Sequence, residues 1–129
     1  MNIKQALEKL RDDKNYYGKF GQKFLSNSNI KTLFTNPAAI HEEQQKTSAF
    51  LVGGYFHTAI LEPDKLKKYL VIPSATRNTK LYKEMSGGEL CLLQHEVDHI
   101  EKLSEKLLNN ETCNHLINKG LVEHEVPGC

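Results

Sequence analysis

Only two stretches of this chain have the residue pattern of β-strands, and this shortage constrains the fold more than any other feature. The first covers residues 69–72, directly before Pro73, and the second covers residues 121–126, where apolar and polar residues partly alternate. A single strand leaves its backbone N–H and C=O groups unpaired, and even a two-stranded hairpin is marginal in water. We therefore expect the second stretch to pair with the first or to join a sheet on polypeptide outside this chain.

Helical periodicity dominates the remainder of the sequence. Apolar residues recur at helical spacing in residues 3–10, 29–35, 49–61, 94–109 and 110–119, and the run over 94–109 is the clearest of these. The polar segment 74–88 predicts a loop with a small basic cluster of Arg77, Lys80 and Lys83. Because no linker-like tract divides the chain, we expect residues 1–129 to form a single unit with an α-rich α/β fold.

The composition excludes several classes of protein. Seventeen Lys and Arg residues stand against sixteen Asp and Glu residues, so the formal net charge is +1 and any contact with DNA must be local. The three cysteines form no Cys-x-x-Cys pair, which fits packing residues in a reducing cytoplasm. No apolar window approaches eighteen residues, so we expect no membrane partner.

His57 is the first residue that indicates a site. It is the single basic side chain in the apolar run 49–61, which predicts a buried helix, and Gly53 lies four residues earlier on nearly the same face. A glycine there removes side-chain bulk beside the imidazole and leaves room for a ligand or another backbone. A lone histidine on an apolar helix is, however, also typical of a hydrogen-bonded core residue.

A wider pattern around His57 resembles a known family. Gly53-x-x-x-His57 is followed by Leu-Glu-Pro at residues 61–63 and is preceded by Ser-Asn-Ser-Asn-Ile-Lys-Thr-Leu-Phe-Thr-Asn-Pro-Ala at residues 26–38. This pattern resembles the N-terminal part of phage exonucleases of the PD-(D/E)XK superfamily, in particular the exodeoxyribonuclease VIII-like group. The resemblance extends over residues 24–126. It implies a fold made of the N-terminal helical portion and first strand or strands of that nuclease.

The resemblance also implies an activity and its residues. The family hydrolyses phosphodiester bonds of duplex DNA, stepwise from an end, in phage recombination or replication, and the complete enzyme is expected to be a homo-oligomer. His57 matches the family histidine at or near the catalytic Mg²⁺. Glu125, or in second place Glu123, matches the glutamate that helps to hold the metal. The loop that carries Arg77 and Lys80 corresponds to a segment near DNA, where these two side chains would contact the phosphate backbone.

The family's remaining catalytic groups are not found in this sequence. They are an aspartate and a Glu-x-Lys pair downstream of the first strand, which bind Mg²⁺ and position the attacking water. Because Mg²⁺ takes octahedral oxygen coordination anchored by carboxylates, one imidazole and one carboxylate are insufficient. We therefore expect the chain to be the leading half of a split or truncated nuclease, inactive alone and completed by a second polypeptide.

A second constellation predicts different chemistry. Residues 95–99 fit His-Glu-x-x-His, in which His95 and His99 would bind Zn²⁺ and Glu96 would act as general base, and the motif resembles the metal-binding helix of peptide deformylases. The two histidines share their predicted helix face with Lys102 and Lys106, which is unfavourable for a cation. The motif is therefore interpreted either as a zinc site or as a solvated helix face. A zinc hydrolase and a non-catalytic binding remnant are the alternatives to the nuclease half.

Overall fold

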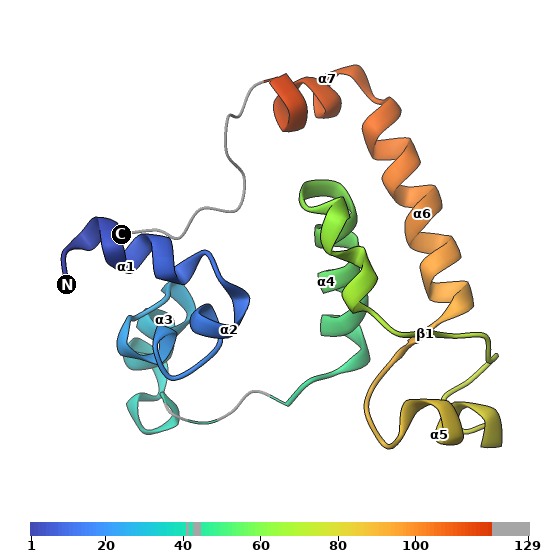
Figure 1. Ribbon diagram of the computed structural model, residues 1–129, viewed down its shortest axis with the longest axis horizontal. Coiled ribbons are helices and arrows are strands. Elements are labelled where there is room, and N and C mark those ends of the chain that lie inside the picture. The colour runs from blue at the N-terminus through green and yellow to red at the C-terminus, as the bar shows by residue number, and fades with distance from the viewer. Residues whose placement is uncertain (41, 43–44, 120–129) are drawn as a thin grey trace. The chain divides into compact units, whose positions relative to one another are not determined.

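The computed structural model describes residues 1–40, 42 and 45–119. The contacts divide the chain into two compact units, of which the described parts are residues 1–40 with 42, and residues 45–119 (Figure 1). The architecture is helix-rich with a small parallel sheet, as the sequence predicts at the level of an α-rich α/β fold. That residues 1–129 form part of one nuclease domain stays a prediction.

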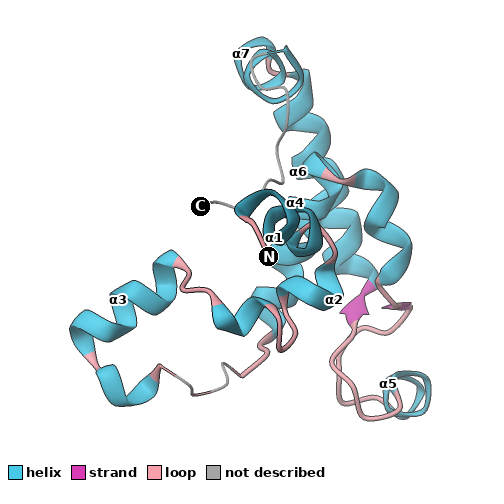
Figure 2. Cartoon of the chain, turned by 60° about the vertical axis from the view of Figure 1, so that its left-hand side comes forward, coloured by secondary structure: helices cyan, strands magenta, loops and turns pink. Residues whose placement is uncertain are grey.

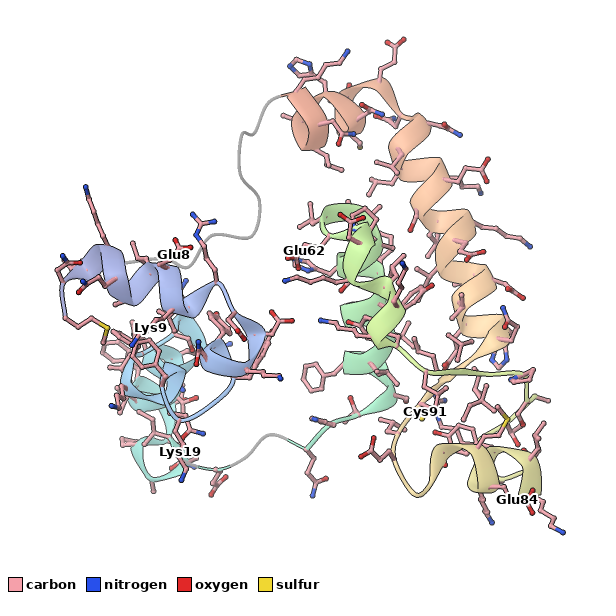
Figure 3. All side chains as sticks on the ribbon, viewed as in Figure 1. Glu8, Lys9, Lys19, Glu62, Glu84 and Cys91 are labelled. Carbon is pink, nitrogen blue, oxygen red and sulfur yellow. The ribbon has the colours of Figure 1, made fainter. Side chains whose placement is uncertain are left out.

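The first unit is a set of short helices with strong N-terminal caps. Its elements are α1 (Ile3–Leu10), α2 (Asp13–Tyr16), the 3₁₀ turn η1 (Gly21–Lys23), α3 (Asn27–Thr35) and the 3₁₀ turn η2 (Pro37–Ala39). Capping boxes at Asn2 and Ser26 begin α1 and α3, so the helices predicted over 3–10 and 29–35 are confirmed, the second with an earlier start. Lys9 (Figure 3) lies over the ring of Phe20 at 5.6 Å.

The second unit contains the longer helices and both strands (Figure 2). Its elements are α4 (Ser48–Leu61), the 3₁₀ segment η3 (Pro63–Lys68), β1 (Val71–Ile72), α5 (Lys80–Ser86), β2 (Leu92–Leu93), α6 (Gln94–Asn109), α7 (Glu111–Asn114) and the π-helical η4 (His115–Lys119). The helices predicted over 49–61 and 94–109 are confirmed. The helix predicted over 110–119 forms as two consecutive pieces, α7 and η4.

The sheet pairs β1 with β2 in parallel, in the register Val71 with Leu92 and Ile72 with Leu93. The sequence does not predict β2, because two leucines directly before an amphipathic helix look like part of that helix. Strands as short as these are defined by their partner rather than by their own pattern. The strand predicted over 121–126 lies outside the described residues.

The core of the second unit has two parts. One packs α4 against α6 around β2, and the other lies between β1, β2 and α5; they consist of Tyr55, Leu92, Val97 and Ile100, and of Ile72, Tyr82, Cys91 and Leu93. The buried residues of α4 are Tyr55 and Thr58. The helix is thus covered on one side and not enclosed, although its apolar sequence predicts a buried helix.

The loop predicted over 74–88 is wrong in its second half, where α5 forms. Thr79 caps the helix, because its Oγ1 accepts the N–H of Tyr82 at 3.2 Å. Gly87, with φ of +60°, ends the helix in the left-handed conformation that glycine adopts without strain. Tyr82 and Ser86, one turn apart, form the buried face of this helix. Because the segment is mostly polar and its buried face is narrow, the sequence does not predict this helix.

Within the described ranges, the helices are all too short or too polar to cross a bilayer.

Candidate functional site

His57 lies on the exposed side of α4. The buried residues Tyr55 and Thr58 define the covered side, and His57, two positions after Tyr55, is rotated away from that residue by about 200°. Gly53, one turn earlier, is also exposed, and a Cβ atom added there would meet no atom within 4 Å. His57 is therefore not a core histidine. The glycine and the imidazole share one open helix face.

The neighbouring Gly54 serves packing instead. A Cβ atom added at this position would lie 3.3 Å from the Tyr69 hydroxyl oxygen, so the glycine permits the close approach of Tyr69, the residue after η3, to α4. Thr58 Oγ1 donates to the Gly54 carbonyl at 2.8 Å and lies 3.2 Å from the same Tyr69 hydroxyl. Tyr55 packs edge-on against Tyr69 with ring centroids 5.3 Å apart, and burial raises the pKa of Tyr55, assisted by the charge of Glu101. The two adjacent glycines thus differ, because Gly53 faces open space and Gly54 packs against Tyr69.

The expected second metal ligand is not part of this geometry. Glu125 and its alternative Glu123 lie outside the described residues. Within the part of the chain that the structure describes, no three His, Cys, Asp or Glu side chains converge so that they could hold a metal ion. A metal bound by His57 would therefore need ligands from beyond the described ranges or from another polypeptide. The predicted Mg²⁺ site stays a prediction.

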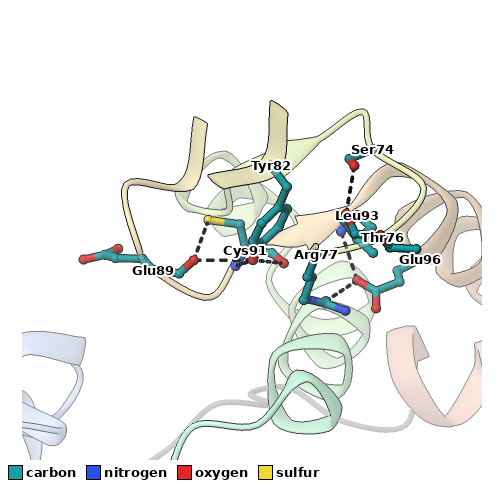
Figure 4. A network of polar contacts seen from close by, with 8 residues as sticks. All are labelled: Ser74, Thr76, Arg77, Tyr82, Glu89, Cys91, Leu93 and Glu96. Atoms are coloured by element: carbon teal, nitrogen blue, oxygen red, sulfur yellow. Dashed lines mark hydrogen bonds and ion pairs between the residues drawn. The ribbon is translucent and has the colours of Figure 1, made fainter. Parts of the chain in front are cut away.

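Arg77 forms an ion pair with Glu96 (Figure 4). Arg77 Nη2 donates to Glu96 Oε2 at 2.7 Å, and the two side chains are 25% and 17% exposed. The same carboxylate oxygen accepts the N–H of Leu93 at 2.9 Å, so Glu96 also caps the N-terminus of α6. Arg77 Nε is buried and has no hydrogen-bond partner among the described residues. One carboxylate therefore attaches the 74–79 loop to the start of α6.

The pKa values of this pair reflect the close contact. Burial by itself would raise the pKa of Glu96, but the hydrogen bonds from Arg77 and from the Leu93 N–H outweigh burial, and the pKa is lowered. The hydrogen bond to Glu96 likewise raises the pKa of Arg77 against the opposing effect of burial. Both groups are therefore charged at neutral pH.

Lys80 occupies a different environment from Arg77. It begins α5, and its Nζ lies 3.7 Å from Glu84 Oε1, with side-chain exposures of 90% and 64%. Figure 3 shows Glu84 on α5. A pair this exposed contributes little free energy, so the ammonium group is available to another anion. The contact of Arg77 and Lys80 with DNA stays a prediction.

The His-Glu-x-x-His motif lies on the first turns of α6. His95 and His99 are exposed, whereas the Glu96 carboxylate accepts hydrogen bonds from Arg77 and from the Leu93 backbone. A general base in this motif needs a carboxylate directed at a metal-bound water. Glu96 instead has a structural role, which the sequence does not predict. Its position three residues after the helix N-cap is the one signal in the sequence that indicates a cap.

A second polar network surrounds Tyr82 and Cys91 (Figure 4). The Tyr82 hydroxyl accepts the Cys91 N–H at 2.7 Å and lies 3.3 Å and 3.4 Å from the carbonyl oxygens of Cys91 and Glu89. Burial, together with the charge of Glu89, raises the pKa of the Cys91 thiol. A thiol of this kind is unreactive. Cys91 is therefore a packing residue, as its sequence context predicts.

Comparison with known proteins adds no further constraint. No family description, no curated protein and no solved structure matches the chain.

Proposed function

We propose that this chain is the N-terminal part of a Mg²⁺-dependent DNA exonuclease whose remaining metal ligands lie on a second polypeptide. His57 and Glu125 help to hold the metal, and Arg77 and Lys80 contact the phosphate backbone of duplex DNA. The observation that carries the proposal is the exposed pair on α4, in which His57 stands one turn after a glycine that faces open space.

The coordination chemistry of Mg²⁺ accounts for the need for a partner. This cation takes six ligands, mainly carboxylate and water oxygens, and phosphodiester hydrolysis requires stabilisation of both the attacking and the leaving oxygen. An exposed imidazole supplies one nitrogen ligand and leaves the other positions open to groups from outside. The second polypeptide therefore contributes the aspartate, the glutamate and the lysine of the resemblance, and the chain alone is inactive.

The basic residues fit a backbone contact that does not read sequence. Lys80 is almost fully exposed at the start of α5 and is held weakly by Glu84. Arg77 is oriented by Glu96 through Nη2, so a phosphate would bind through another nitrogen of the guanidinium. Because contacts of this kind position a protein on DNA without recognising bases, we expect no sequence preference.

The geometry favours this proposal over a zinc hydrolase. In the hydrolase, Glu96 would have to exchange its hydrogen bonds from Arg77 and Leu93 for a metal-bound water. That exchange would leave a largely buried guanidinium without its counter-ion, which is costly.

The test is reconstitution with the second half. The chain is mixed with the polypeptide that carries Asp and Glu-x-Lys, and the loss of linear duplex DNA is measured with Mg²⁺. His57→Ala should lower the rate by about 100-fold or more, because losing even an indirect metal partner costs 10–100-fold. The matched control is His99→Ala, another exposed helical histidine, which should leave the rate unchanged.

Three results would contradict the proposal. Equal activity of His57→Ala and the unmodified mixture would exclude a metal role for His57. One equivalent of tightly bound zinc that disappears in His99→Ala would instead favour the hydrolase. Association of the two polypeptides with no DNA degradation in any mixture would identify a non-catalytic binding remnant.

A further inference from the structure

The two edges of the small sheet differ in their backbone groups. In a parallel ladder, each hydrogen-bonded residue bonds to the two neighbours of the residue opposite it. The Leu92 N–H donates to the Leu70 carbonyl at 3.2 Å, and Val71 is opposite Leu92. Ile72 and Leu92 therefore carry the bonds between the strands. The N–H and C=O groups of Val71 and Leu93 point away from the partner strand, in opposite directions.

The edge at β2 is closed. The outward N–H of Leu93 donates to Glu96 Oε2 at 2.9 Å. Leu93 is also the N-cap residue of α6, so the chain leaves the sheet and enters a helix at this point. The Glu96 carboxylate therefore occupies the position at which another strand would bond, and the sheet cannot grow on this side.

The edge at β1 is open in the described part of the chain. No described residue forms a hydrogen bond with the outward N–H or C=O of Val71. Leu70, directly before the strand, exposes 51% of its surface. Two exposed lysines, Lys67 and Lys68, end the preceding segment η3. Within the described residues, this edge thus has an unbonded backbone donor and acceptor, and an exposed apolar residue and two lysines directly precede the strand in sequence.

The two faces of this small sheet are covered by helices, as is typical of a larger parallel sheet. Ile72, Leu92 and Leu93 are 0%, 1% and 3% exposed, because helices α4, α5 and α6 cover the strands. Parallel sheets are normally covered in this way and contain more than two strands. Val71 is partly buried, so burial of the four strand residues is nearly complete, whereas their hydrogen bonding is not.

We propose that the outer edge of β1, at Val71, receives a β-strand from the polypeptide that carries the missing catalytic carboxylates. The inference rests on the proposed function and names the surface through which the two halves join. The added strand pairs with the Val71 N–H and C=O, places an apolar side chain against Leu70, and has acidic residues near Lys67. Main-chain bonds of this kind join an extended segment to an exposed edge in many complexes.

Amide hydrogen exchange tests the contact directly. The full chain is studied alone and together with the product of the reading frame that follows its gene, which the proposal requires to encode the missing strands. The Val71 amide should exchange at least about tenfold more slowly in the complex, as expected for one added hydrogen bond. The Leu93 amide, which is already bonded to Glu96, is the internal control and should change little.

A pair of variants gives a second measurement. Val71→Pro removes the outward N–H but no bond between β1 and β2, and Val71→Ala keeps the backbone unchanged. The proline variant should bind the second polypeptide about tenfold more weakly than the alanine variant. If Val71→Pro does not fold, hydrogen exchange in the unmodified chain decides the question.

The possible failures are distinguishable. A complex that degrades DNA while the Val71 amide remains unprotected would overturn the docking edge and leave the proposed function intact. Protection of that amide already in the chain alone would do the same, because it would mean that the chain itself occupies the edge. A following reading frame without the missing strands, or a mixture that neither associates nor degrades DNA, would overturn both.

Discussion

Replacement of Glu96 gives the sharpest test of how the second unit is held together. Its carboxylate joins the 74–79 loop to the N-terminus of α6 through bonds to Arg77 and to the Leu93 N–H. Glu96→Ala removes both bonds and leaves a guanidinium that is only 25% exposed without its counter-ion. Glu96→Gln keeps an oxygen that can accept the Leu93 N–H and loses the charge.

The two variants should differ in magnitude. Loss of a helix cap costs about 1 kcal/mol. In exposure, the ion pair is intermediate between two classes. Fully exposed pairs contribute about 0–1 kcal/mol, and disruption of fully buried pairs costs about 3–5 kcal/mol. Because about a fifth of each side chain remains exposed, we assign the pair about 1–2 kcal/mol. Glu96→Gln should therefore lose about 1–2 kcal/mol and Glu96→Ala about 2–3 kcal/mol of unfolding free energy.

Thermal unfolding followed by circular dichroism measures these losses. A change of 1 kcal/mol moves the Tm of a unit this small by about 4–8 °C, so Glu96→Ala should lower the Tm by more than about 8 °C. The control is Glu84→Gln, which breaks an exposed pair 3.7 Å long and should leave the Tm unchanged.

The pH dependence follows from the lowered pKa of Glu96. Its ionised form is favoured by folding, so its contribution to stability is complete above the ordinary glutamate pKa of 4.5 and is lost as the pH falls through the lower, folded value. The Tm difference between the unmodified chain and Glu96→Gln should therefore shrink in acid. Equal Tm values at pH 7, a difference that persists unchanged in strong acid, or an equal loss in Glu84→Gln would refute the reasoning.

Two further predictions concern packing, each measured by urea unfolding. Gly53→Ala should stabilise the chain by about 0.5–1 kcal/mol through helix propensity, because the added Cβ meets open space. Gly54→Ala should gain less, because the Cβ would lie 3.3 Å from the Tyr69 hydroxyl, and equal gains would contradict this difference. Tyr82→Phe should cost about 1–3 kcal/mol, because the buried Cys91 N–H loses its acceptor; a loss no larger than in the exposed control Tyr16→Phe would disprove this.

The predicted helices succeeded where local signals agree. The helix at Ile3–Leu10 has an asparagine cap and a regular apolar stripe, and the helix at Gln94–Asn109 has an apolar face sustained over four turns. Such patterns act within a few residues of one another. The loop predicted at 74–88 failed because α5 buries only two residues, Tyr82 and Ser86, and a face this narrow leaves no clear periodicity in a polar segment.

The candidate site divides in the same way. The shared face of Gly53 and His57 follows from a spacing of four in a helix, so the sequence is sufficient to predict it. The sequence is not sufficient to predict the ion pair of Arg77 with Glu96, because nineteen residues separate the partners and no local pattern connects them. Polarity alone predicted Arg77 to be a surface residue, and its guanidinium instead lies against the start of α6.

The sequence by itself determined where the long helices begin and end, because caps, apolar spacing and glycines act over one or two turns. Only the tertiary structure decided that Val71–Ile72 pairs with Leu92–Leu93, that the β2 edge is closed while the β1 edge is unpaired among the described residues, and that Glu96 is a structural anchor. Strand pairs and buried ion pairs derive their stability from partners distant in the chain. Their energies depend on folding as a whole, and no short segment encodes them.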